Sequence, residues 1–515
     1  MKFHLNEYPE YLEEIDAMGT DELLTAVLCP DIPIGKRDLT RKTQTIFFHP
    51  TTVDVAVGAA NEVNEGRALP ALIASDMEYG PGRAVVGSTV FPSMRAAAES
   101  RDENLAYQMG VSAALEGRAS GYHWTFAPCV DILGNRDNPI VSIRCPGEDA
   151  DTVIKYGGAY MRGIQDNGMI ATLKHFPGDG YCINDQHITV ADNPLSREEW
   201  DATFGRVYGE LIDQGAMAIM PGHITLASYD EIDPETGLYP PASVSKNLLT
   251  GILRERFGFE GIIVSDATNM TGFCGYINRF RAAARFLEAG GDSLLFMHDD
   301  EEYHTEMNKM LDEGVLTLET LKARVYRMMC FRRQYFDFLA TLPTPTPDRS
   351  ASEAIAAEMV DKSVKVHRNR KGLLPFAINK DTRIAHYVIY NSNTTDMTPA
   401  KELTEKLSAL SDHVEEFIDV GPSTSLKIAK SGNYDLIICS VLTDFAWGTN
   451  MIKLCGPMAR NMMNGWTRYG TPSVFVSYHS PYFADDYYAV VDTIINTYGY
   501  NSYTNDAVIR RILGK

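Results

Sequence analysis

The chain has 515 residues, too many for one ordinary hydrophobic core, so we expect two domains or one barrel with a second domain. Hydrophobic residues make up 44% of the chain and charged residues 22%, which excludes a disordered or fibrous protein. The formal net charge of -21 argues against a nucleic-acid partner, because binding to a phosphate backbone needs clustered Lys and Arg.

The N-terminal stretch, residues 1–19, is acidic and lacks the apolar core of a secretory signal. No apolar run approaches the roughly 20 residues that span a bilayer. The eight cysteines are scattered singly without a CxxC pair, so neither a zinc cluster nor a disulfide framework is indicated. This cysteine usage suits a reducing compartment, and we expect a cytoplasmic protein without a membrane partner.

Short β-branched apolar runs alternate with helical patterns in the first 300 residues. The runs are 44–49, 71–76, 124–130, 169–175, 216–223, 261–267 and 292–298. Helix-like segments between them cover 94–118, 148–166, 196–214, 245–257 and 278–289. Repeated strand–helix units predict an α/β fold with a parallel sheet. Seven detected strands and one undetected strand would make eight, which fits a (β/α)8 TIM-like barrel better than an open sheet.

Polar residues gather where these apolar runs end. They are Asp76, Lys174, His175, His223, Asp266 and His298. One such residue would be interpreted as a helix cap or a solvent-facing side chain. Because the carboxyl ends of barrel strands form the mouth that carries active sites, their repetition at successive strands predicts a functional site there.

A segment that alternates Pro with Thr, residues 341–350, follows a long amphipathic stretch at 317–340 and favours extended backbone over helix. We therefore predict a catalytic barrel over 1–340, a linker over 341–352 and a second domain over 353–515.

The second domain again alternates strand with helix. Its apolar runs are 384–390, 415–420, 435–441, 473–478 and 492–498. This order predicts a smaller, doubly wound α/β domain. It contains no GxGxxG or P-loop motif, so no nucleotide cofactor is expected, and we expect it to pack against the barrel or to form a homodimer.

The segment KHFPGDGYCINDQH, residues 174–187, starts at a strand end and continues into a loop punctuated by Gly and Pro. Its polar side chains are therefore expected over the mouth of the barrel. Asp185 and His187 are two residues apart, a spacing that lets the carboxylate hydrogen-bond the imidazole. Such a bond fixes the tautomer and raises the basicity of the histidine, which suits it to proton transfer.

This segment resembles the signature of family 3 glycoside hydrolases, in the branch of the β-N-acetylglucosaminidases. The signature is K-H-F-P-G-x-G, four variable residues, then D-x-H, and the segment matches every fixed position. The resemblance implies that His187 is the general acid/base and Asp185 its partner. β-Glucosidases of this family lack the D-x-H element and take a glutamate acid/base from elsewhere. Asp179 stands where the branch usually has His, and Gln186 stands where it usually has Ser or Thr. These two departures affect the expected fine specificity more than the expected reaction class.

Two further stretches are similar to the same family. Residues 126–153 are similar to the stretch ending in R-S-F-G-E-D and suggest Arg144 as a sugar-binding residue. Residues 71–83 resemble a D-x-E-x-G segment whose Asp, here Asp76, binds substrate hydroxyls. The predicted substrate contacts are therefore Asp76, Arg144, Lys174, His175 and His223.

Asp266 is the candidate nucleophile, because it follows the apolar run 261–264 directly and its surroundings, 241–270, resemble the nucleophile loop of the family. The alternative is an N-cap of the next helix. A carboxylate here would attack the anomeric carbon as the oxocarbenium-like state develops and leave a covalent glycosyl-enzyme. Two such displacements retain the β configuration.

The sequence thus predicts a retaining, exo-acting β-N-acetylglucosaminidase that acts on a small carbohydrate without metal or other cofactor. A phosphorylase stays open, because a neutral histidine base does not repel an approaching anion, and so does a β-glucosidase of the same family. A non-catalytic sugar-binding protein would have to lack the nucleophile or the acid. A metal hydrolase built on His175, His187 and His223 lacks a ligand pattern such as HExxH.

Overall fold

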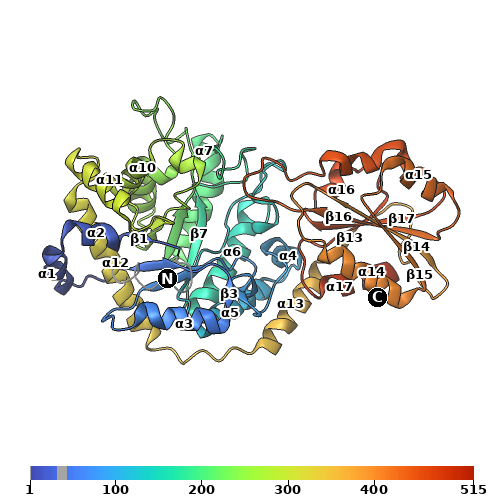
Figure 1. The fold of residues 1–515 in the computed structure, drawn as a ribbon, viewed down its shortest axis with the longest axis horizontal. Helices are drawn as coiled ribbons and strands as arrows, with labels where there is room; N and C mark the ends of the chain where they lie inside the picture. Colours follow the sequence, from blue (N-terminus) through green and yellow to red (C-terminus); the bar gives the residue numbers. More distant parts are fainter. Residues whose placement is uncertain (1, 32–42) are drawn as a thin grey trace. The chain divides into compact units, whose positions relative to one another are not determined.

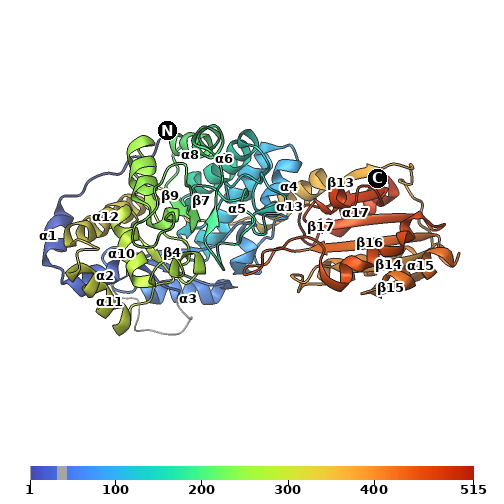
Figure 2. The ribbon, with the colours of Figure 1, turned by 90° about the horizontal axis from the view of Figure 1, so that it is seen from above.

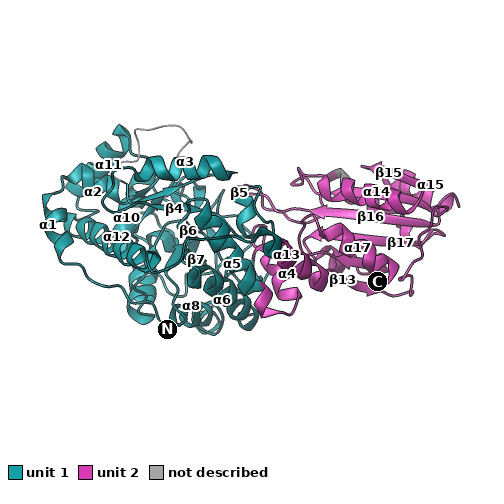
Figure 3. Ribbon diagram, turned by 90° about the horizontal axis from the view of Figure 1, so that it is seen from below, with its two compact units in different colours: residues 1–90, 106–135, 145–352 teal, residues 91–105, 136–144, 353–515 magenta. Residues whose placement is uncertain are grey.

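The computed structural model describes residues 2–31 and 43–515. The chain forms two compact units (Figure 3). Unit 1 comprises 1–90, 106–135 and 145–352, and unit 2 comprises 91–105, 136–144 and 353–515. Residues 91–105 and 136–144 thus group with unit 2 although they lie in the N-terminal half of the chain. A single boundary at 341–352 does not predict this long-range association. That division into separately folding domains stays a prediction.

Unit 1 is built on a curled, parallel six-stranded sheet with the order β11-β9-β7-β6-β4-β2. Its strands are β2 (Thr45–Phe47), β4 (Leu72–Ser75), β6 (Trp124–Thr125), β7 (Ile170–Phe176), β9 (Ala218–Pro221) and β11 (Ile262–Ile263). A parallel pair, β1 (Leu28–Cys29) with β12 (Leu294–Leu295), continues it through parallel bridges between Asp31 and Phe47 and between Val264 and Ser293. The seven apolar runs each overlap one of these strands, and β1 is the strand that the sequence pattern missed.

The first two helices of the chain precede β1 and the others follow strands, and the helices lie outside the sheet (Figure 1). They are α1 (Glu10–Ala17), α2 (Thr20–Ala26), α3 (Val53–Asn64), α5 (Glu103–Ala119), α6 (Ala150–Asp166), α7 (Arg197–Trp200), η3 (Asp201–Gly205), α8 (Arg206–Asp213), η5 (Asn247–Arg256), α9 (Thr271–Cys274), α10 (Arg279–Ala289), α11 (Glu301–Asp312) and α12 (Leu318–Leu339). The short elements are β3 (Thr51–Thr52), η1 (Pro81–Arg83), β5 (Val85–Val86), β8 (Ala191–Asp192), β10 (Ile224–Thr225) and η4 (Ala242–Val244). The sheet encloses a core that includes Phe47, Trp124, Phe126 and Met220.

The predicted helix 94–118 is two helices, α4 (Met94–Glu99) and α5, instead of one. Between them Arg101 has a φ of 58°, which is incompatible with continued helix. The Asp102 carboxylate accepts a hydrogen bond from the Asn104 N–H at 3.1 Å and so starts the second helix.

Unit 2 contains a six-stranded sheet with the order β13-β18-β17-β16-β14-β15, antiparallel only at β13. Its strands are β13 (Lys365–Asn369), β14 (Arg383–Tyr390), β15 (His413–Ile418), β16 (Leu436–Thr443), β17 (Ser473–His479) and β18 (Thr493–Asn496). Figure 2 shows β14, β16 and β17 side by side. The five predicted runs are the five parallel strands.

Alternate residues of these strands enter two separate cores, so the sheet is buried on both faces. Ile384 and Val388 pack with α13 (Arg349–Ser363), α14 (Thr398–Leu410) and α17 (Thr504–Leu513). Ala385 and Tyr387 pack with α15 (Pro422–Lys430), η6 (Gly456–Arg468) and α16 (Phe483–Asp486). The short helix η2 (Ser142–Arg144) completes this unit.

The extended segment that follows α12 ends at Asp348, whereas the predicted linker continued to residue 352. Helix α13 begins at Arg349 because the Asp348 carboxylate accepts a hydrogen bond from the Ala351 N–H at 3.0 Å, the contact of an N-cap. All eight cysteines are free thiols. In the described part of the chain, no helix is both long and apolar enough to cross a bilayer.

Candidate active site

The predicted site residues of unit 1 lie at the carboxyl ends of neighbouring parallel strands. Asp76 follows β4, Lys174 and His175 end β7, His223 follows β9 and Asp266 follows β11. Because every strand pair between β4 and β11 is parallel, these residues share one edge of the sheet.

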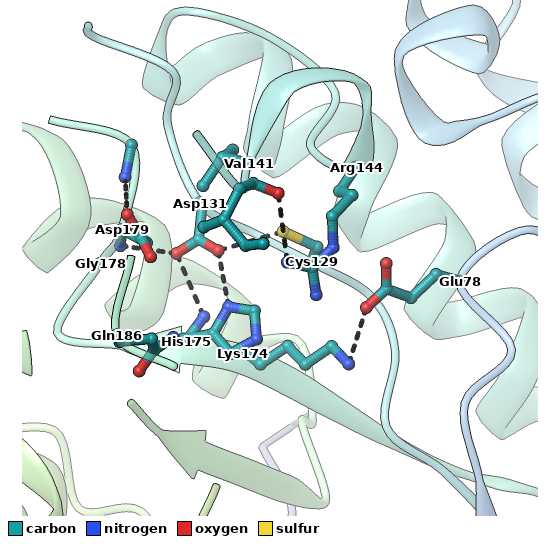
Figure 4. A network of polar contacts seen from close by, with 12 residues as sticks. Glu78, Cys129, Asp131, Val141, Arg144, Lys174, His175, Gly178, Asp179 and Gln186 are labelled. Atoms are coloured by element: carbon teal, nitrogen blue, oxygen red, sulfur yellow. Dashed lines mark hydrogen bonds and ion pairs between the residues drawn. The ribbon is translucent and has the colours of Figure 1, made fainter. Parts of the chain in front are cut away.

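Lys174 is held between two carboxylates. Its Nζ lies 2.9 Å from Asp76 Oδ1. It also lies 2.7 Å from Glu78 Oε1, the contact drawn in Figure 4. The lysine and Glu78 side chains are 5% and 10% exposed, whereas that of Asp76 is 52% exposed. The buried ammonium is therefore fixed, while the Asp76 carboxylate is open to a ligand hydroxyl. The sequence analysis did not single out Glu78, although the D-x-E-x-G pattern contains it.

His175 is held by Asp131, a fully buried carboxylate that sequence reasoning also missed (Figure 4). Asp131 Oδ2 accepts hydrogen bonds from His175 Nδ1 at 2.8 Å and from the Cys129 thiol at 3.1 Å. Asp131 Oδ1 accepts from the backbone N–H groups of His175 at 3.1 Å and Asp179 at 2.8 Å. With Nδ1 engaged, the imidazole has Nε2 for a ligand. Asp131 follows the predicted run 124–130, so the strand-end pattern contained the signal.

Cys129, Asp131 and His175 also bring potential metal-ligand atoms within 4.8 Å of one another. A metal would replace the thiol proton and the Nδ1 proton. Both protons bond to the Asp131 carboxylate, so hydrogen bonds satisfy the thiol and the imidazole Nδ1 in this structure.

Asp179, which stands where the family branch usually has His, is buried inside the loop. Its Oδ1 accepts hydrogen bonds from the Gly180 N–H at 2.6 Å and the Cys182 thiol at 3.2 Å. Burial raises the pKa of Asp179, and the neighbouring charge of Asp131 raises it further. These contacts give Asp179 a role in loop conformation.

Asp185 and His187 form the pair that the spacing predicted. Asp185 Oδ1 lies 2.5 Å from His187 Nδ1 and accepts the His187 backbone N–H at 2.9 Å. The Asp185 side chain is fully buried, and that of His187 is 25% exposed. A buried carboxylate on Nδ1 stabilises the imidazolium and leaves proton exchange to Nε2.

Asp266 is partly exposed, and its Oδ1 accepts a hydrogen bond from the Ala267 N–H at 2.8 Å. Burial raises the pKa of the Asp266 carboxyl, but electrostatic interactions with three imidazoles and the Ala267 hydrogen bond outweigh burial and hold that pKa below its usual value. The imidazoles are those of His175, His187 and His223. The alternative of an N-cap is wrong, because α9 begins at Thr271 and its N-cap position is Met270.

The loop of His187 and the loop of Asp266 are joined through their backbones. Thr271 N–H donates to His187 O at 3.0 Å, and Gly272 N–H donates to Gln186 O at 3.1 Å. These bonds fix the candidate acid/base relative to the chain that follows the candidate nucleophile.

His223 lies at the predicted edge, but both ring nitrogens bond to protein. Nε2 lies 3.1 Å from Ala267 O, to which it donates, and Nδ1 lies 2.9 Å from the Ser243 hydroxyl, from which it accepts. Burial lowers the pKa of His223 to about 4, so the ring is neutral near pH 7. Its backbone N–H donates to Gln186 Oε1 at 2.6 Å. This geometry favours a positioning role over the predicted contact with substrate.

Arg144 is buried in η2 and groups with unit 2. Its backbone N–H donates to Val141 O at 2.8 Å (Figure 4), and its guanidinium lies 5.9 Å from the centroid of the Phe445 ring. The described contacts lie within unit 2, so a contact between Arg144 and a sugar stays a prediction.

The family model described as "Glycosyl hydrolase family 3 N terminal domain" matches residues 40–330. A Cellulomonas fimi protein named "Beta-N-acetylglucosaminidase/beta-glucosidase" is 29% identical over 97% of this chain and 92% of its own. A "Beta-hexosaminidase" of Methylobacillus flagellatus is 31% identical over 47% of this chain and 69% of its own.

Two solved structures are similar over nearly the whole chain. "Beta-glucoside phosphorylase BglX" has a TM-score of 0.88 and 28% identity, with 98% of this chain and 93% of that one covered. A glycoside hydrolase family 3 beta-N-acetylglucosaminidase from Paenibacillus sp. has a TM-score of 0.81 with 97% of each chain covered, and at 22% identity it bears on the fold alone.

Proposed function

Because this chain belongs to glycosyl hydrolase family 3 and is a glycoside hydrolase, we propose that it is a retaining, exo-acting enzyme that removes terminal non-reducing β-linked N-acetylglucosamine. The bonded pair of Asp185 and His187, joined through backbone hydrogen bonds to the loop of Asp266, carries this proposal. The names of the Cellulomonas and Methylobacillus relatives agree with it.

We also propose that the sheet of unit 1 closes with the β1–β12 pair into a (β/α)8 barrel, since parallel bridges join that pair to both edge strands. Unit 2 is a doubly wound α/β domain, since its sheet has helices on both faces and its strand order extends outward in both directions from β14 and β16.

In the first chemical step, the ionised Asp266 carboxylate attacks the anomeric carbon while His187 donates its Nε2 proton to the departing glycosidic oxygen. The products are a covalent glycosyl–Asp266 ester and the free leaving-group sugar, whose new hydroxyl carries the proton from His187. In the second step, neutral His187 takes a proton from water as that water attacks the same carbon and releases Asp266. Asp185 stays ionised throughout and stabilises the imidazolium, as the carboxylate of a catalytic triad does.

Lys174, His175 and Asp76 bind the hydroxyls of the terminal N-acetylglucosamine unit, the sugar that is transferred to Asp266 in this mechanism. The first two are nearly buried and held by Glu78 and Asp131, so they meet the sugar in one geometry. Contacts of this kind strengthen as the ring distorts and therefore contribute to kcat as well as to binding.

A second candidate is a phosphorylase, because the structure with a TM-score of 0.88 carries the name of a beta-glucoside phosphorylase. The chemistry differs only in the second step, where inorganic phosphate in place of water attacks the glycosyl–Asp266 ester. A neutral His187 base does not repel that anion as a carboxylate would.

The deciding experiment is product analysis with chitobiose and with a muropeptide, each with and without inorganic phosphate, alongside the 4-nitrophenyl glycosides of N-acetylglucosamine and glucose. We expect free N-acetylglucosamine with net retention of the β anomer and a preference for the N-acetylated aryl glycoside. Phosphate-dependent release of a sugar 1-phosphate would establish the phosphorylase instead, and a preference for the glucoside would make the enzyme a β-glucosidase.

A further inference from the structure

The mechanism uses side chains from β4, β6, β7, β9 and β11, and the remaining part of the same carboxyl edge carries a second group of polar and aromatic residues. Phe296 and His298 follow β12, Asp31 follows β1 and His49 follows β2. The parallel pairing and bridges put these strand ends on the same edge as Asp266. We call Asp31, His49, Phe296 and His298 the rim cluster.

The centre of the rim cluster is the Asp31 carboxylate. Its Oδ2 lies 2.9 Å from His49 Nε2, and its Oδ1 lies 3.1 Å from His298 Nε2. The imidazoles are 57% and 45% exposed, so they stand open to solvent. Because Nε2 of each ring bonds to Asp31, Nδ1 of each ring is the atom for a further hydrogen bond.

Phe296 provides an aromatic surface beside these rings. Its centroid is 5.7 Å from that of His49 and 5.1 Å from that of Phe47. The φ of Phe296 is 58°, a conformation that bulky residues avoid and that surrounding contacts have to hold. Its N–H donates to Cys29 O at 2.9 Å, and Arg279 Nη2 donates to its carbonyl at 2.6 Å.

The same Arg279 nitrogen donates to the Thr268 hydroxyl at 2.7 Å, two residues after Asp266. Phe296 also packs against the core cluster that contains Ala267 and Met270. Phe296 of the rim cluster is thus fixed, through Arg279 and this packing, to the loop of the candidate nucleophile.

We propose that the rim cluster is the binding site for the leaving-group sugar, the second pyranose of a β-linked disaccharide. This proposal rests on the proposed function. An aromatic face with a few polar groups suits a pyranose, whose C–H face packs on the ring while its hydroxyls bond to imidazole nitrogens and carboxylate oxygens. The Asp31 carboxylate at the centre disfavours an anionic ligand.

Exposure separates this site from that of the terminal N-acetylglucosamine, which stays bound to Asp266 in the first step. Lys174 and His175 are only 5% and 6% exposed, as a pocket for a terminal sugar requires. The open imidazoles of the rim cluster suit the part of the substrate that extends outward and leaves first.

The test compares chitobiose with 4-nitrophenyl N-acetylglucosaminide in the full chain carrying His298→Ala, His49→Ala or Asp31→Ala. We expect kcat/KM for chitobiose to fall about tenfold or more in each variant and that for the aryl glycoside to fall less than about threefold. A tenfold loss corresponds to about 1.4 kcal/mol, which is the order of one hydrogen-bonding contact. The matched control is His4→Ala, which removes an exposed imidazole paired 2.6 Å from Glu260 ahead of β11, and it should leave the ratio unchanged.

A binding measurement keeps the test independent of turnover. In the Asp266→Asn background, chitobiose should bind about tenfold more tightly than N-acetylglucosamine, and His298→Ala should remove that difference. Equal losses on both substrates, or an unchanged affinity ratio, would overturn the rim cluster as a sugar site. If the enzyme proves specific for glucose, cellobiose and 4-nitrophenyl glucoside replace chitobiose and 4-nitrophenyl N-acetylglucosaminide in both measurements. A wrong sugar specificity is thereby distinguished from a wrong assignment of the rim cluster.

Discussion

Two histidines of the site are oriented in the same way, each by a buried carboxylate on Nδ1. Asp131 holds His175 and Asp185 holds His187. The rings differ in exposure, 6% for His175 and 25% for His187. A nearly buried ring suits a fixed contact with the sugar, whereas a ring open to solvent suits proton exchange with a leaving group and water.

At this scale the first prediction concerns Asp266. Asp266→Asn removes the nucleophilic charge but keeps the size and shape of the side chain. Turnover should therefore fall at least about a thousandfold, because the covalent step loses its nucleophile. The melting temperature should stay near that of the parent. Kinetics and thermal unfolding measure both. Asp300→Asn is the matched control, because Asp300 caps α11 and Asn caps equally well. Residual activity within tenfold of the parent would show that Asp266 is not the nucleophile.

The second prediction separates proton transfer from nucleophilic attack. An aryl leaving group departs largely unaided, whereas the oxygen of a leaving sugar needs a proton. His187→Ala should therefore lower kcat/KM about 10²–10⁴-fold on chitobiose and far less on the aryl glycoside. Azide, which needs no base, should restore turnover and give a β-glycosyl azide. Asp185→Ala should show a weaker form of the same pattern. Equal losses on both substrates without azide rescue would assign the acid to another residue.

At the scale of elements, the loop after β7 and the start of α9 act as one structure. Their two backbone hydrogen bonds depend on a close approach at Gly272. A Cβ on this glycine would lie 2.6 Å from His223 Cβ, 2.7 Å from Gln186 O and 2.9 Å from Thr189 O. Two of these atoms are backbone atoms of the His187 loop, so a methyl group has to push that loop away from the loop of Asp266.

We therefore expect Gly272→Ala to lower kcat about a hundredfold, since displacing a catalytic group by about 1 Å costs that much. Circular dichroism should show an unchanged fold. Gly251→Ala is the control, because a Cβ there meets nothing within 4 Å inside η5, and it should preserve activity and add up to about 1 kcal/mol of stability. A kcat for Gly272→Ala within threefold of the parent would mean that the two loops move independently.

At the scale of the whole molecule, buried histidines make stability depend on pH. Burial lowers the pKa of His386 to about 3 and those of His123 and His223 to about 4. The folded state keeps these rings neutral, whereas an unfolded chain protonates them below about pH 6.5. Stability is therefore lost as pH falls from about 6.5 toward 4, at up to about 1.4 kcal/mol per pH unit for each ring.

The corresponding prediction is measured as proton uptake on unfolding, which does not require both units to unfold together. His386 bonds to the hydroxyls of Ser440 at 2.7 Å and Thr404 at 2.8 Å, and Gln can replace both contacts. At pH 5, unfolding of His386→Gln should take up about one proton fewer than unfolding of the parent. The exposed His413→Gln should change nothing, and equal uptake by parent and His386→Gln would show that His386 is already protonated in the folded state.

Local patterns determined much of this protein. Apolar periodicity located seven of the eight strands in the curled sheet and its flanking pair, because burial on both faces leaves a continuous apolar run. β1 (Leu28–Cys29) escaped because only Val27 separates it from α2 (Thr20–Ala26), so its apolar residues continue the apolar pattern of that helix. The motif at 174–187 predicted the family, which the comparison over residues 40–330 confirmed, and its two-residue spacing predicted the contact between Asp185 and His187.

Partners that are distant in the chain were decided only by the tertiary structure. Asp131 meets His175 and Glu78 meets Lys174 because different strands end at one edge, and no local pattern encodes which ends are adjacent. The ring of His223 turned out to be engaged with Ser243 and Ala267, contacts that depend on the packing of three segments. Likewise, the rim cluster exists only because β1, β2 and β12 are neighbours across about 270 residues of chain. Sequence thus determined which chemistry is present, and long-range packing decided which groups act together.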